Sequence, residues 1–274
     1  MILVHFTPTG GKRVADLQGI FQDATALLVG GAPSLKDQCI NRLTERGVLT
    51  MAMNNAALHF RPNLWVSGDN PNCYDPQILK DPGIMKFAPM AQADVEIFDA
   101  PYYRLPNLFF YLQEPNTPWE DYLAPGPAVP WYGNTLFSAI YALYTFGIRR
   151  IILAGSDFGF GADSAYAHDA NLSEDERTWN MYLYDHQVEQ LRLLQPLFDN
   201  CGLTLMDCSK HSRLKGCYPH VSMDEAIELC QEDLPAPQNP AELPHCSVYA
   251  SRSIEQYLQD WPELDTIQSE TLEK

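Results

Sequence analysis

The sequence predicts one α/β domain built around a mostly parallel sheet, with helices layered on both faces. Short apolar runs with the length of buried strands alternate with segments of helical pattern, and glycine closes many of these segments. The chain has 274 residues, which is enough to bury a full core. We therefore expect the α/β domain to span residues 1–232, followed by a proline-rich linker and a small C-terminal helix packed on the core over residues 233–274.

The expected elements follow one another along the chain. Strands are expected at Ala26–Val29, Val48–Met53, Leu64–Ser67, Arg150–Leu153 and Leu203–Met206, with further candidates at Ile84–Phe87 and Asn107–Leu112. Helices are expected at Leu35–Arg46, at Leu136–Phe146, from Ser173 to a kink or end at Pro196, at Ser222–Leu229 and at Ser251–Trp261. Ser34 is expected to cap the first helix, and Ser173 with Glu176 and Ser222 with Glu225 have the spacing of capping boxes.

Composition and charge exclude several classes of protein. Eighteen basic and 35 acidic side chains give a net charge of −17, which disfavours a nucleic-acid partner. The sequence has no run of the roughly 18 apolar residues that a membrane span needs, and its start lacks the basic region of a signal peptide. The seven cysteines form no CxxC pair, so we expect free thiols, no metal site and a soluble cytoplasmic protein.

Small polar residues follow nearly every expected strand. Ligands of open α/β sheets bind beyond the carboxyl ends of the strands, so these residues are expected to form a site, although turns favour the same residue types. They are Gly30-Gly31-Ala32-Pro33-Ser34, Asn54-Asn55, Gly68-Asp69-Asn70, Gly155-Ser156-Asp157 and Asp207-Cys208-Ser209.

The first of these turns is the most informative. Gly30 and Gly31 allow the backbone to approach a ligand closely, and the start of the expected helix behind Ser34 offers free N–H groups to a phosphate. The turn is neither a P-loop nor a GxGxxG fingerprint, because the lysine and the further glycine of those motifs are missing.

From Leu28 to Lys36 the chain resembles two related families, the metal-independent bacterial sialyltransferases and the archaeal hydroxymethyl-dihydropterin pyrophosphokinases. The resemblance continues at Met53-Asn54, at Gly133-Asn134-Thr135 and from Ala142 to Phe158, and it covers about residues 24–230, with 69–130 poorly matched. It implies a Rossmann-like three-layer sandwich with a lid segment after the strand end at Gly155–Asp157. Residues 164–169 resemble that lid.

The sialyltransferase resemblance assigns roles to individual residues. Gly31, Ser34, Asn54 and Thr135 would hold cytidine monophosphate (CMP), Tyr166 would contact the leaving phosphate, and His186 would accept the acceptor's proton. His168 and His211 are the other candidate bases. By their place at strand or helix ends, the remaining candidate nucleotide-binding residues are Gly30, Asp69, Asn134 and Asp157.

Three functions remain open at this point. The leading hypothesis is a glycosyltransferase that moves a sugar from a CMP-type donor to a hydroxyl acceptor, with no cofactor. The second is an ATP-dependent pyrophosphokinase in which Asp69 and Asp157 hold magnesium, because Asp69 replaces an amide residue of the sialyltransferases. The third is a nucleotide-binding protein without catalysis. Each residue also has a plainer interpretation: His186 as a core histidine, Tyr166 as an ordering residue of a loop, and Asp157 as a turn acid.

Overall fold

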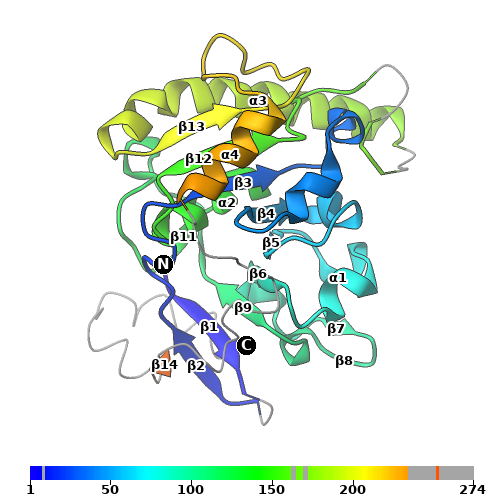
Figure 1. The fold of residues 1–274 in the computed structure, drawn as a ribbon. Coiled ribbons are helices and arrows are strands. Elements are labelled where there is room, and N and C mark those ends of the chain that lie inside the picture. Colours follow the sequence, from blue (N-terminus) through cyan, green and yellow to red (C-terminus); the bar gives the residue numbers. More distant parts are fainter. Residues whose placement is uncertain (8–9, 162–164, 169–171, 234–250, 253–274) are drawn as a thin grey trace.

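A computed structural model describes residues 1–7, 10–161, 165–168, 172–233 and 251–252, and its centre is a mostly parallel sheet. The sheet has the order β13-β12-β3-β4-β5-β6-β9-β1-β2-β14, parallel from β13 to β9 and antiparallel beyond β9 (Figure 1). Its strands are β1 (Leu3–Phe6), β2 (Lys12–Ala15), β3 (Thr25–Val29), β4 (Leu49–Met53), β5 (Leu64–Val66), β6 (Met85–Pro89), β9 (Leu108–Tyr111), β12 (Arg150–Ala154), β13 (Thr204–Asp207) and β14 (Ser251–Arg252).

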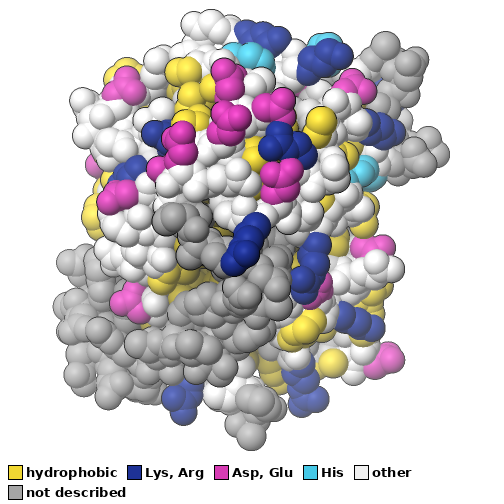
Figure 2. Space-filling model, in the orientation of Figure 1, with side chains coloured by type: hydrophobic (Ala, Val, Ile, Leu, Met, Phe, Trp, Pro, Cys, Tyr) yellow, Lys and Arg dark blue, Asp and Glu magenta, His cyan; other side chains and the backbone are white. Residues whose placement is uncertain are grey.

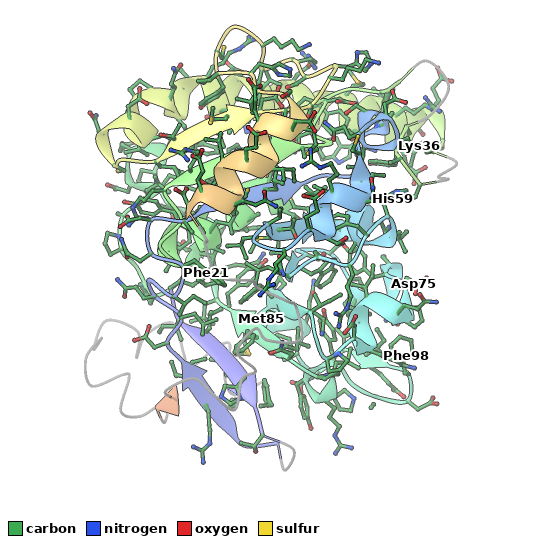
Figure 3. All side chains as sticks on the ribbon, viewed as in Figure 1. Phe21, Lys36, His59, Asp75, Met85 and Phe98 are labelled. Atoms are coloured by element: carbon green, nitrogen blue, oxygen red, sulfur yellow. The ribbon has the colours of Figure 1, made fainter. Side chains whose placement is uncertain are left out.

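Helices cover both faces of this sheet, so its central strands are apolar on both sides. Along β3, Leu28 belongs to one core, and its neighbours Leu27 and Val29 belong to the other. The helices are α1 (Pro76–Lys80), α2 (Thr135–Thr145), α3 (Glu174–Asn200) and α4 (Met223–Asp233). α2 and α3 pack on the first core, and α1 and α4 pack on the second. Met85 of β6, in the interior of the molecule (Figure 3), belongs to the first core.

The order of the strands reverses beside β3. From β3 the chain moves outward through β4, β5, β6 and β9, and then returns to place β12 and β13 on the other side of β3. The carboxyl ends of β3 and β12 therefore flank the point at which an open α/β sheet leaves a crevice for a ligand. The stretch of sequence from β6 to α2 also forms two small sheets. One consists of β7 (Glu96–Ile97) and β8 (Ala100–Pro101), and the other of β10 (Gln113–Glu114) and β11 (Val129–Pro130).

Most of the expected elements are confirmed. Each strand expected from the sequence is present with small shifts in its bounds, and both predicted capping boxes form. The N-terminal hairpin of β1 and β2, which extends the sheet beyond β9 (Figure 1), did not stand out in the sequence.

Two expected helices differ from the prediction. Residues 35–46 do not form one α-helix. Most of them belong to two short 3₁₀ helices, Pro33–Asp37 and Ile40–Thr44, which are separated by the extended residue Gln38 and by Cys39. Ser34 caps neither helix, because Asp157 binds its hydroxyl and amide groups. α3 continues through Pro196 to Asn200. Leu194 and Phe198 are buried on either side of the proline, and their packing offsets the lost backbone hydrogen bond.

The C-terminal prediction is tested at two residues. Ser251–Arg252 form β14, which pairs with β2, so these two residues are not helical. The rest of the expected helix and the linker over 234–250 lie outside the described residues. Among the described helices, none has both the length and the apolar character of a membrane-spanning segment.

Candidate nucleotide-binding site

One cavity of about 540 Å³ lies at the carboxyl ends of the central strands and collects most of the predicted site residues. Those that line it are Gly30, Gly31, Asn54, Asp69, Asn134, Thr135, Asp157, Tyr166 and His168. Ser34, His186 and His211 are not among its lining residues. Nine of the twelve candidate residues therefore line the cavity. Of the five polar strand ends, the last does not reach it: Asp207, Cys208 and Ser209 are outside the lining, and the Ser209 hydroxyl instead accepts a hydrogen bond from the Ser156 amide.

The two glycines of the first turn have different roles. A Cβ atom on Gly30 would lie 2.6 Å from the carbonyl oxygen of Gly155, so Gly30 is needed for the close approach of the ends of β3 and β12. A Cβ atom on Gly31 would have one neighbour within 4 Å, the Ala56 nitrogen at 3.9 Å. Gly30 thus serves packing, while Gly31 leaves room in the cavity.

Ser34 and Asp157 bind each other below the first turn. The Asp157 carboxylate accepts hydrogen bonds from the Ser34 amide at 3.0 Å and from its hydroxyl at 2.5 Å, and both residues are buried. The expected phosphate site behind Ser34 is therefore wrong, because an internal carboxylate already uses its donors and the helix there is a single short 3₁₀ turn. The two hydrogen bonds from Ser34 to Asp157 link the first turn to the segment that follows β12.

Tyr74 organises the polar residues on the β4–β5 side of the cavity. Its hydroxyl lies 3.1 Å from Oδ1 of Asn54 and 3.0 Å from Oδ2 of Asp69, and it accepts a hydrogen bond from Ser67. Burial, and secondarily the charge of Asp69, raises the pKa of Tyr74 well above its usual value, so this hydroxyl stays protonated at neutral pH. Sequence reasoning missed Tyr74, because it lies in residues 69–130, which match the two resembled families poorly.

Thr135 and Asn54 belong to the same cluster of polar residues around Tyr74. Oγ1 of Thr135 accepts from the Gly68 amide at 3.2 Å and lies 3.4 Å from Oδ1 of Asn54. Asn54 has a φ of +51°, a left-handed conformation that asparagine tolerates better than most residues. The residue is thereby turned at the end of β4 so that its amide lines the cavity.

The N-terminus of α2 supplies the helix end that faces the cavity. Gly133, Asn134, Thr135 and Leu136 all line it, and Oδ1 of Asn134 caps the helix by accepting from the Phe137 amide at 3.3 Å. The amides of Thr135 and Leu136 lie in the first helical turn and have no acceptor within the helix. This end of α2 therefore combines free donors with the positive end of a helix dipole.

The lid-like segment lies against the first turn. The Ala167 amide donates to the carbonyl oxygen of Gly31 at 2.8 Å, and Ala165 and Ala167 are buried. The rings of their neighbours Tyr166 and His168 stack, with centroids 5.1 Å apart and an interplanar angle of 11°. Both residues line the cavity. Residues 162–164 and 169–171 of the segment lie outside the described residues.

One face of α3 lines the cavity next to the lid-like segment. Its lining residues are Trp179, Asn180, Leu183, Tyr184 and Gln187, which recur with helical spacing. Burial, followed by the neighbouring Tyr166, raises the pKa of Tyr184 well above its usual value. That spacing of polar and aromatic residues was the one signal in the sequence that could have identified this face.

His186 lies on another side of α3. Its ring meets the edge of Trp119 with centroids 6.5 Å apart, and it is half-buried there. His59, near Lys36 (Figure 3), is also outside the cavity lining, and its pKa is lowered by burial and by the Lys36 charge. Of the described histidines, the one that lines the cavity is His168.

The charged side chains that line the cavity are acidic. Its described lining includes the carboxylates of Asp69 and Asp157 but no lysine or arginine. Within the described parts of the chain, no group of three or more His, Cys, Asp or Glu side chains is arranged to hold a metal ion. On the described surface in Figure 2, Lys and Arg side chains are interspersed with acidic and uncharged ones and form no continuous basic stripe.

The chain was compared with protein-family models, with curated proteins and with solved structures. No match was found in any of the three. The geometry of the cavity and the chemistry of its residues therefore carry the functional argument.

Proposed function

We propose that the cavity binds a CMP-activated sugar and transfers the sugar to a hydroxyl acceptor, without a cofactor, as the resemblance to metal-independent sialyltransferases implies. The observation that carries this proposal is the convergence of strand-end residues and the N-terminus of α2 on one cavity. The reversal of strand order between β3 and β12 also supports a Rossmann-like interpretation of the fold.

The wall around Tyr74 suits the nucleoside. Asn54, Asp69, Tyr74 and Thr135 present amide, carboxylate and hydroxyl groups within one hydrogen-bonded cluster. A carboxylate such as Asp69 accepts hydrogen bonds from a ribose diol, which explains an acid at this position in a nucleotide site. The cytosine base would then lie along the other strand-end residues that line the cavity.

The N-terminus of α2 and Tyr166 suit the phosphate. Free amides at a helix start bind a phosphate oxygen, and the Tyr166 hydroxyl can donate a further hydrogen bond as the leaving group gains charge. The cavity lining offers these neutral donors and no lysine or arginine among its described residues. Such a site is suited to the single negative charge of the phosphodiester in a CMP-sugar and much less to a triphosphate.

His168 is the best placed base. It accepts the proton of the acceptor hydroxyl while the acceptor oxygen bonds to the anomeric carbon of the sugar. The bond from that carbon to the phosphate oxygen breaks, and CMP leaves with the electron pair. His168 is a better candidate for this role than His186, because His168 lines the cavity beside Tyr166 and His186 contacts Trp119 instead.

The alternative functions predict different ligands. A pyrophosphokinase needs magnesium between its carboxylates and ATP, but Asp157 is already bound by Ser34. A nucleotide-binding protein without catalysis would bind CMP and leave CMP-sugars intact.

CMP is expected to raise the melting temperature in the presence of EDTA, because the proposed site uses no metal. At about 100 times its dissociation constant a ligand adds about 2.7 kcal/mol to stability, which thermal unfolding detects readily. Magnesium with ATP is the matched comparison. Stabilisation by magnesium-ATP but not by CMP would favour the pyrophosphokinase, and stabilisation by neither would contradict both enzymes.

The Gly31→Val variant is expected to keep its fold and lose the CMP-induced shift in melting temperature. The new side chain meets little protein within reach of its Cβ atom and therefore occupies ligand space. Gly30→Val is the matched control, since its Cβ atom would collide with the Gly155 carbonyl and lower stability without any ligand. An unchanged CMP shift in Gly31→Val would remove this turn from the site.

A further inference from the structure

The outer face of α3 carries large apolar side chains that remain in water. Trp179 and Tyr182 are each 60% exposed, and Leu193 is 66% exposed. The opposite face of the helix packs in the first core through Val188, Leu191, Leu194 and Phe198. Packing within the chain therefore gives no reason for large apolar residues on the outer face, and such a group of exposed residues marks an interaction surface.

The residues of this outer face recur with the spacing of a coiled-coil contact. Trp179, Tyr182, His186, Glu189, Leu193 and Pro196 follow one another at alternating intervals of three and four residues. We call these residues the α3 seam. All of them are exposed except His186, which is half-buried. Alternating intervals of this kind place residues on one narrow stripe of a helix, along which a second helix can pack.

The α3 seam is complementary to itself when two copies run antiparallel. Its members lie symmetrically about the midpoint between Gln187 and Val188. A twofold axis through that point would bring together three kinds of pair, namely Trp179 with Pro196, Tyr182 with Leu193 and His186 with Glu189. Each pair joins groups that attract, because an aromatic ring meets an apolar side chain or an imidazole meets a carboxylate.

Charged residues also favour the antiparallel direction. Asp185 and Arg192 flank the α3 seam on one side, at positions that face each other across an antiparallel helix pair. Arg192 is exposed, and the Asp185 side chain is 61% exposed even though it binds Arg213 within the chain. Two copies would therefore form the Asp185–Arg192 pair twice. A parallel copy would instead place Glu189 against Glu189, which is repulsive.

We propose that the α3 seam binds the α3 seam of a second copy, in an antiparallel dimer with twofold symmetry. Both copies use the same surface, so the interface closes on itself and leaves no seam exposed. Trp179 lines the cavity, so the second copy would also cover the edge of each cavity. The dimer does not depend on which ligand the cavity binds.

Sedimentation velocity at increasing protein concentration tests the dimer. We expect the wild type to reach twice the mass of one chain, and Leu193→Asp to associate about tenfold more weakly or worse, because its carboxylate would face the ring of Tyr182. Phe98→Asp is the matched control, because Phe98 is 40% exposed at the turn between β7 and β8, away from α3 (Figure 1). Its association should equal that of the wild type. A wild type that stays monomeric, or a Leu193→Asp variant that associates equally well, overturns the proposal.

Reversal of the flanking charges tests the antiparallel direction. Asp185→Arg and Arg192→Asp each put like charges opposite one another in a dimer, so each variant alone should associate about tenfold more weakly than the wild type. In a mixture of the two variants, the arginines of one chain face the aspartates of the other, and association should recover. Unchanged melting temperatures of the separate variants would show that both are folded. If the mixture associates no better than the separate variants, the antiparallel pairing is wrong.

Discussion

Replacing His168 with alanine is expected to lower turnover of a CMP-sugar by about 10²- to 10⁴-fold, the usual contribution of a general base. Donor affinity should change little, because the proposed role of His168 begins only when an acceptor hydroxyl loses its proton. His168 lines the cavity and stacks on Tyr166, which is expected to contact the leaving phosphate. Turnover and the CMP-induced melting shift, measured on the same variant, separate catalysis from binding.

His186→Ala is the informative partner of this experiment. The resemblance to sialyltransferases assigns the base to His186, whereas the cavity geometry favours His168. We expect a smaller loss of turnover at His186, together with a loss of stability from its contact with Trp119. If His186→Ala causes the larger loss of turnover at unchanged stability, the base is His186 and His168 acts only in ordering the lid segment.

Replacing Gly155 with alanine is expected to give the largest loss of stability, about 4 kcal/mol or more. Gly155 has a φ of +55°, and a Cβ atom there would lie 2.5 Å from the Gly30 carbonyl oxygen. The left-handed backbone alone costs an alanine roughly 1–2 kcal/mol. The collision adds to this cost because both partners are backbone atoms directly after the paired ends of β3 and β12, which cannot move aside as a flexible side chain could.

Gly133→Ala measures the cost of the left-handed backbone without a collision, so the difference between the two variants gives the contribution of the collision. Gly133 also has a positive φ, of +75°, but a Cβ atom there would have no neighbour within 4 Å. Its loss of stability should therefore be close to the backbone term of roughly 1–2 kcal/mol. Urea denaturation of the two variants measures the difference, and equal losses would show that the close contact of β3 with β12 does not constrain the fold.

The sequence predicted the parallel core well because its signals are local. Ala26–Val29 and Arg150–Leu153 are apolar runs closed by glycine, and each corresponds to a strand of the sheet. The capping box of Ser173 and Glu176 is equally local and is present. The same signals placed Gly31, Asn54 and other strand-end residues in one cavity.

The differences arise where distant residues decide the local structure. Ser34 was expected to cap a helix, but its donors bind Asp157, 123 residues away in the chain. Pro196 was expected to kink or end α3, and buried neighbours carry the helix through it. Tyr74 holds Asn54 and Asp69 through its hydroxyl, a contact that no spacing in the sequence indicates. The order of His168 and His186 as candidate bases likewise depends on which side of α3 faces the cavity.

Release of CMP from CMP-sialic acid in the presence of EDTA tests the central claim most directly. Water or an added sugar serves as the acceptor, and the cleaved bond is the one between the anomeric carbon and the phosphate oxygen. We predict that the wild type releases CMP without metal and that His168→Ala does so about 10²- to 10⁴-fold more slowly. A wild type that binds CMP but never releases it from the sugar, or that needs magnesium to act on a nucleotide, would contradict the assignment as a metal-independent glycosyltransferase.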